Sequence, residues 1–216
     1  GLWDYTKKDY HTWVYKEEIN NILPPIVSTE TSINMNYNGN RIKIGVGIHD
    51  SSSALLPYIR GSKKPFVLVS TGTWSVSLNP YFESLLTSDD IAKDTINYMR
   101  INGKAVKSSK LLLGNEYKYQ VTELSKYFDV PYEQHKSVKF NSEIFHNLSE
   151  NFKQCFCWKD LSDADMPKET MISHTTYEEA YHQLMIELVQ LQVKNIESAK
   201  GGDTSIKRLF VDGGFS

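Results

Sequence analysis

The stretch Arg41–Pro80 decides the predicted fold, and its sequence is RIKIGVGIHDSSSALLPYIRGSKKPFVLVSTGTWSVSLNP. Isoleucine and valine concentrate in two apolar segments, Arg41–Ile48 and Phe66–Ser70, which are predicted as strands. Asp50 follows the first strand, and the turn Thr71–Trp74 follows the second. Glycine at such a junction lets backbone N–H groups face an incoming anion, and flanking hydroxyls add donors. A carboxylate after one strand and a phosphate-binding turn after the next are two parts that phosphoryl transfer requires.

Each of these two motifs also fits a purely structural interpretation. Asp50 and the three serines after it match a helix N-cap, and on spacing alone the cap is the favoured interpretation. Ser70–Thr73 has a composition that is common in ordinary turns. Neither motif decides the function by itself.

The rest of the chain supplies the elements of an α/β domain. Ser51–Ile59 and Gly114–Phe128 are predicted helices, and Thr176–Lys200 is the clearest helix because its apolar residues recur at helical spacing. Trp74–Leu78 alternates polar and apolar residues, which predicts a strand buried on one face. The last helix leads into a predicted strand over Arg208–Val211, and ligands gather at the carboxyl ends of strands in such folds.

Three motifs resemble those of the FGGY carbohydrate kinases, and they occur in the family's order. Gly47–Ala54 (GIHDSSSA) and Ser70–Trp74 (STGTW) are most similar to the rhamnulokinase and L-fuculokinase branch. Leu209–Ser216 (LFVDGGFS) resembles the adenosine-binding turn of the same family as glycerol kinases carry it. Asp212 and Phe215 depart from the residues usual in that branch, so the resemblance to the branch rests on the first two motifs.

The resemblance implies an actin-like, ribonuclease H-like α/β fold with a mixed sheet flanked by helices. Residues 1–40 would be the tail of the N-terminal FGGY domain and a hinge. Residues 41–216 would be the C-terminal FGGY kinase domain, incomplete at its end. Because the chain begins with Gly and stops just after a ligand turn, we expect a fragment of a longer protein. Such a fragment is expected to be inactive alone, since the active site of this family lies between two domains.

The resemblance also implies the chemistry and the residues that carry it. The reaction would transfer the γ-phosphate of ATP to a hydroxyl of a small sugar, such as the ketoses L-rhamnulose or L-fuculose, with ATP and Mg²⁺ as cofactors. Asp50 would be the general base and contact the sugar, and His49 would contact the sugar beside it. The residues expected to bind the nucleotide are Thr71, Gly72, Thr73, Gly213 and Gly214. The family aspartate that helps to hold Mg²⁺ belongs to the other domain, so no metal ligand is assigned here.

Composition and charge limit the classes of partner and the kinds of site that the sequence supports. With 216 residues and a formal net charge of −2, the chain offers no electrostatic reason to expect nucleic acid or an anionic membrane as a partner. No apolar run is long enough to span a bilayer and no secretion signal is present, so a cytoplasmic location is expected. Cys155 and Cys157 lie too close together for a disulfide framework and make a poor metal site. Asp163 and Asp165 could pair at a metal, although such a surface pair is more often simply solvated. A homodimer is compatible with the sequence.

Two other classes of function stay open. An actin-like ATPase or a sugar-binding regulator would share the fold and the phosphate turns without phosphorylating a sugar. It would lack a working base at position 50, where this chain has Asp50. A noncatalytic interaction module would need neither Asp50 nor the glycine turns.

Overall fold

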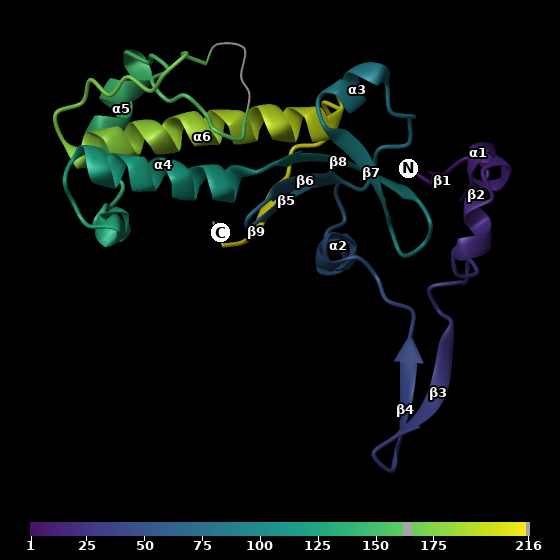
Figure 1. The fold of residues 1–216 in the computed structure, drawn as a ribbon. Helices are drawn as coiled ribbons and strands as arrows, with labels where there is room; N and C mark the ends of the chain where they lie inside the picture. The colour runs from purple at the N-terminus through teal and green to yellow at the C-terminus, as the bar shows by residue number, and fades with distance from the viewer. Residues whose placement is uncertain (162–165, 215–216) are drawn as a thin grey trace.

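Residues 1–161 and 166–214, which a computed structural model describes, form both helices and strands (Figure 1). In chain order the elements are β1 Trp3–Asp4, β2 Asp9–Tyr10, α1 Thr12–Lys16, the 3₁₀ helix η1 Ile19–Ile22, β3 Ser32–Tyr37, β4 Asn40–Gly45, α2 Asp50–Gly61, β5 Val67–Thr71, β6 Ser75–Asn79, α3 Ser88–Ala92, β7 Thr95–Met99, β8 Ala105–Leu111, α4 Leu113–Tyr127, the 3₁₀ helix η2 Tyr132–Ser137, α5 Ser142–Glu150, α6 Tyr177–Lys200 and β9 Leu209–Gly213.

Five of the strands form one mixed sheet in the order β7-β8-β6-β5-β9. The pairs β5–β6, β6–β8 and β7–β8 are antiparallel, and short connections join β5 to β6 and β7 to β8. The last strand, β9, pairs in parallel with β5, so their carboxyl ends meet at one end of the sheet. A long connection that includes α4, α5 and α6 separates these two strands in the sequence.

Helices cover both faces of this sheet (Figure 1). On one face α2 buries Leu55 in an apolar cluster with residues of β5, β6 and β8. On the other face α6 places Gln192 and Asn195 against the serines of β6 and β8: Gln192 bonds to Ser75 and donates to Ser77 over 3.1 Å. The strand predicted over Trp74–Leu78 is expected to be buried on one face only. That expectation is wrong, because its polar face is also buried under side chains that hydrogen-bond to it.

The strand predicted over Arg41–Ile48 does not enter the sheet. It is shorter, β4, and it pairs with β3 in a two-stranded hairpin that stands apart from the five-stranded sheet (Figure 1). The turn at Asn38 and Gly39 joins the two strands, and both residues have the positive φ that a tight hairpin turn requires. The residue expected at an interdomain hinge, position 40, lies at this turn, and the domain boundary itself stays a prediction.

The predicted helices are confirmed as α2, α4 and α6, with small shifts at their ends. In α6 the Thr176 hydroxyl accepts from the Glu179 N–H over 3.2 Å, and Gly201 ends the helix with a φ of 63°. No helix within the described ranges is both long enough and apolar enough to cross a membrane.

Two buried carboxylates hold an extended segment against α4 and α6. Glu187 accepts from the backbone N–H groups of Cys155 and Phe156 over 2.8 and 3.2 Å. Glu116 accepts from the N–H groups of Lys159 and Asp160, the latter over 2.8 Å. Both carboxylates are almost fully buried, and their hydrogen bonds hold the backbone of residues 155–160 in place. The sequence of this segment shows no periodic pattern from which its position could be predicted.

Candidate active site

Two of the sequence motifs meet at the carboxyl ends of the parallel strands β5 and β9. The strands β5 and β9 run side by side in parallel register, with Ser70 opposite Asp212 and Thr71 opposite Gly213. The Thr71 hydroxyl donates to the Asp212 carbonyl over 2.8 Å, and the Gly214 N–H donates to the Thr71 carbonyl over 3.0 Å. The expected phosphate turn and the expected adenosine turn are therefore joined by direct hydrogen bonds.

Gly213 is required by this close approach. Its φ is +98°, and a Cβ at this position would lie 1.9 Å from the Thr71 carbonyl oxygen. Any side chain would collide with backbone there, so only glycine lets the two turns lie this close. Gly214 has open space around it and can approach a ligand.

The turn after β5 is a three-residue hairpin loop, Gly72–Trp74. The Gly72 N–H donates to the Trp74 carbonyl over 2.9 Å, and Thr73 lies exposed at the tip. Trp74 is 46% exposed, and the Lys110 ammonium lies over its ring at 5.2 Å from the centroid. The tip of the turn therefore offers a hydroxyl, an exposed aromatic ring and a nearby cation.

The first turn of α4 packs against the same loop through Gly114, a residue absent from the predicted site. The Gly114 N–H donates to the Thr73 carbonyl over 3.1 Å, and a Cβ on Gly114 would lie 2.1 Å from the Gly72 carbonyl oxygen. No side chain caps this end of α4, and the Thr73 carbonyl of the loop takes the place of a cap for the Gly114 N–H. A glycine directly at the start of a helix that follows a strand was the available signal. Because the N–H groups of Gly72 and Gly114 are already hydrogen-bonded within the protein, an anion such as phosphate would meet the Thr73 hydroxyl and the positive end of α4.

Asp50 lies at the start of α2 and is open to solvent. Its side chain is 93% exposed, and its Oδ1 lies 2.9 Å from Nδ1 of His49. The N-cap residue is His49, whose Nδ1 lies 3.3 Å from the Ser51 N–H, and Asp50 is the first helical residue. The prediction that Asp50 caps the helix is therefore wrong by one position, and its exposed carboxylate accepts from the Ser51 N–H over 2.6 Å.

The structure links α2 to the sheet at two places. Tyr58 packs on Phe210 of β9 with ring centroids 5.1 Å apart. Burial raises the pKa of the Tyr58 hydroxyl, and the Asp212 carboxylate adds to the effect. Ser52 donates to the Met99 carbonyl of β7 over 2.9 Å, at the opposite edge of the sheet. His49 stacks on Tyr98 at this β7 edge, whereas Asp50 contacts His49 and Ser51 at the start of α2.

The other candidates have structural roles or lie elsewhere. His182 is buried on α6, where its Nε2 accepts from the Asn141 N–H over 2.9 Å. Burial, with the Glu187 carboxylate, raises the pKa of the free thiol of Cys155 well above its ordinary range. No group of three or more potential metal-ligating side chains gathers anywhere in residues 1–161 and 166–214. Asp163 and Asp165 lie outside the described residues.

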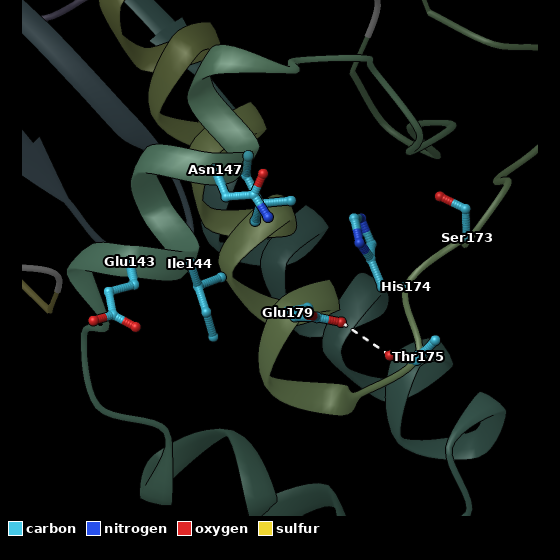
Figure 2. Close-up of a pocket in the computed structure, with 8 residues that line it drawn as sticks. Glu143, Ile144, Asn147, Ser173, His174, Thr175 and Glu179 are labelled. Carbon is cyan, nitrogen blue, oxygen red and sulfur yellow. Dashed lines mark hydrogen bonds between the residues drawn. The ribbon is translucent and has the colours of Figure 1, made fainter.

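A pocket of about 400 Å³ opens between α5 and the start of α6 (Figure 2). His174 and Asn147 face one another across it, and Thr175 bonds to Glu179 over 3.3 Å at its edge. No residue expected to bind nucleotide or sugar lines this pocket. It is therefore separate from the motifs that carry the resemblance.

Comparison with known proteins finds similarity in structure but not in sequence. No family model matches the chain, and no curated protein matches it. A carbohydrate kinase from Novosphingobium aromaticivorans superposes with a TM-score of 0.67 at 17% identity, covering 98% of this chain and 48% of that one. Xylulose kinase from Bifidobacterium adolescentis superposes with a TM-score of 0.56 at 14% identity, covering 99% and 46%.

These similarities confirm the expected fold class, an actin-like α/β fold with a mixed sheet flanked by helices. The chain spans about half the length of the two similar structures. At such low identities the likeness establishes the fold alone.

Proposed function

We propose that this chain forms part of an ATP-dependent sugar kinase that transfers the γ-phosphate of ATP to a hydroxyl of a small sugar. One observation carries the proposal: the turns at Gly72 and Gly213, far apart in the sequence, lie at the ends of adjacent parallel strands and are hydrogen-bonded. Ligands bind at this end of the strands in open α/β sheets. The similarity of the fold to two carbohydrate kinases supports the sugar as acceptor.

Each proposed nucleotide-binding residue has a role that follows from its place. Thr73 and the backbone of Gly72 lie beside the α4 N-terminus, where phosphate oxygens would be stabilised. Thr71, Gly213 and Gly214 form the joined turn, and the open space at Gly214 would let adenosine approach the backbone.

Asp50 is proposed as the general base that accepts the proton of the attacking sugar hydroxyl. Its exposed carboxylate can receive a substrate, and position matters more than strong basicity in phosphoryl transfer. His49 would contact the sugar beside it. The described residues contain no cluster of three or more potential metal ligands, so Mg²⁺ would be held chiefly through the phosphates, whose charge it neutralises when bound.

The finer assignments are also proposals. His49, Asp50 and Trp74 favour L-rhamnulose or L-fuculose as the sugar, by their resemblance to that kinase branch. We further propose a cytoplasmic two-domain protein, in which residues 1–40 close the first domain and 41–216 form most of the second. The 216-residue chain by itself would then be inactive.

The test is ATP consumption by the full-length protein that contains this chain, against L-rhamnulose, L-fuculose, xylulose and glycerol. Turnover stimulated by one sugar, with a phosphorylated sugar detected by ³¹P NMR, is the expected result. ATP hydrolysis that no sugar changes would overturn the kinase proposal and favour an actin-like ATPase.

A further inference from the structure

An aromatic contact holds His49 in place. The His49 imidazole stacks on the ring of Tyr98, with the ring centroids 5.1 Å apart and the planes inclined by 30°. Tyr98 lies on β7, far from His49 in the sequence. The imidazole is more than half exposed at 58%, so this stack is a principal restraint on its orientation.

His49 in turn restrains the carboxylate of Asp50. Its Nδ1 lies 2.9 Å from Asp50 Oδ1. Nδ1 accepts from the Ser51 N–H over 3.3 Å when it carries no proton, and it donates to the Asp50 carboxylate in the form that has the proton on Nδ1. The Ser51 N–H is satisfied by the same Asp50 oxygen at 2.6 Å and does not need the imidazole. The exposed Asp50 carboxylate is therefore held between the Ser51 N–H and the His49 imidazole.

Tyr98 is itself firmly placed. It pairs across the sheet with Val106 of β8, which is fully buried, and it packs against the apolar cluster that includes Leu55 of α2. The neighbouring Met99 carbonyl accepts the Ser52 hydroxyl, which fixes the first turn of α2 on the same strand. Strand β7 is therefore a rigid support for the start of α2.

We propose that Tyr98 is a positioning residue for Asp50, acting through His49, in the reaction proposed above. The inference rests on that proposed function for its kinetic consequence, whereas the contact itself belongs to the 216-residue chain. The ring is the part of Tyr98 that matters, because it provides the stacking surface. The phenol stays protonated, since burial and then the Asp50 charge raise its pKa.

Two substitutions separate the ring from the hydroxyl. Tyr98→Phe keeps the stacking surface, and Tyr98→Leu removes it while keeping an apolar side chain on β7. In proton NMR spectra of the 216-residue chain, we expect the His49 ring protons to lie upfield in the parent and in Tyr98→Phe. In Tyr98→Leu they should move to the position of an unstacked imidazole. Unchanged His49 signals in a folded Tyr98→Leu variant would overturn the inference.

Kinetics of the full-length protein test the consequence. Tyr98→Leu should lower kcat about tenfold, with little change in the KM for ATP, because only the base is misplaced. Tyr98→Phe should restore the parent rate. The same loss in both variants, or a loss confined to the KM for ATP, would contradict positioning through the ring.

The two measurements distinguish the two claims. Upfield His49 signals that shift in Tyr98→Leu support the contact between His49 and Tyr98, whatever the turnover shows. If no sugar then stimulates turnover, that result counts against the proposed kinase activity alone. Sugar-dependent turnover that is equal in the parent and Tyr98→Leu would overturn the positioning role and leave the kinase activity standing.

Discussion

Thr71 donates its hydroxyl hydrogen bond to the backbone carbonyl of Asp212, 141 positions later in the chain, over 2.8 Å. This bond fixes the relative position of the two glycine turns at the ends of β5 and β9. The long connection between the two turns includes α4 and α6, so the proposed nucleotide site depends on the docking of these helices as well as on its own residues.

The joined turns should not tolerate a side chain at position 213. Gly213→Ala would combine a φ of +98° with a Cβ 1.9 Å from the Thr71 carbonyl oxygen. We expect a loss of about 3 kcal/mol in the free energy of unfolding, measured by urea denaturation. Gly47→Ala is the matched control, because a Cβ added there would have no atom within 4 Å and its φ lies outside the left-handed region. Equal stability of the two variants would contradict the geometry of the joined turns.

Gly114→Ala should act on the phosphate loop. Its Cβ would lie 2.1 Å from the Gly72 carbonyl oxygen, so the loop or α4 must move. We expect weaker ATP binding to the full-length protein, measured by calorimetry, in a variant that still folds. Gly61→Ala, on α2 with no atom within 4 Å of the added Cβ, should bind ATP like the parent. Parent-like affinity in Gly114→Ala would remove the α4 N-terminus from the proposed site.

Local sequence patterns predict the two motif turns and the three principal helices, because those features depend on residues close together in the chain. The Asp-Gly-Gly and Thr-Gly-Thr turns are marked by their glycines, and α6 by its apolar spacing and by Gly201 at its end. The parallel pairing of β5 with β9 is not predicted in this way, since it depends on how the long connection folds.

Two segments differ from what their local sequence predicts, and each difference has a physical reason. The turn at Asn38 and Gly39 is a strong hairpin signal, yet the polar composition of Ser32–Tyr37 hides a strand that pairs with β4 and keeps it out of the main sheet. The sequence of residues 88–99 predicts only a weakly helical or irregular segment, which fits α3 but misses the strand Thr95–Met99, because that strand is supported by its pairing with β8. That error concealed Tyr98, and with it the contact to His49.

A buried ion pair anchors α3 to the sheet. Lys107 of β8 is 3% exposed, and its ammonium lies 2.6 Å from Asp90. Asp90→Ala should destabilise the protein by about 3 kcal/mol in urea denaturation, because a buried ammonium is left without its carboxylate. Asp89→Ala removes the exposed pair with Lys93 on the same helix and should change stability little.

The same pair gives a pH dependence. Burial acts against ionisation of Asp90, but hydrogen bonds from Lys107 and Thr87 outweigh it, so the pKa of Asp90 lies below its ordinary value of 3.8. Its contribution to stability is therefore complete above the ordinary value and is lost as the pH falls through the lower folded-state pKa. In Asp90→Ala, the free energy of unfolding should no longer show this loss as the pH falls. The same dependence of stability on pH in the parent and the variant would contradict the pairing.

Glu187 should show the opposite pH dependence. Burial raises its pKa, although hydrogen bonds from Gln183 and from the N–H groups of Cys155 and Phe156 offset part of the effect. The folded state therefore holds the proton more tightly than the unfolded state. Relative to Glu187→Gln, the stability of the parent should fall as the pH rises from the ordinary value of 4.5 through the raised pKa. A constant difference between parent and variant across that range in urea denaturation would contradict the raised pKa.

The most direct test of the central claim is sugar-stimulated ATP turnover by the full-length protein with Asp50→Asn. The account predicts a folded variant whose kcat is at least ~10²-fold lower, because the amide cannot accept the hydroxyl proton. Asp89→Asn, an exposed carboxylate on α3, should keep the parent rate. An Asp50→Asn variant as fast as the parent would contradict the role of Asp50 as the base.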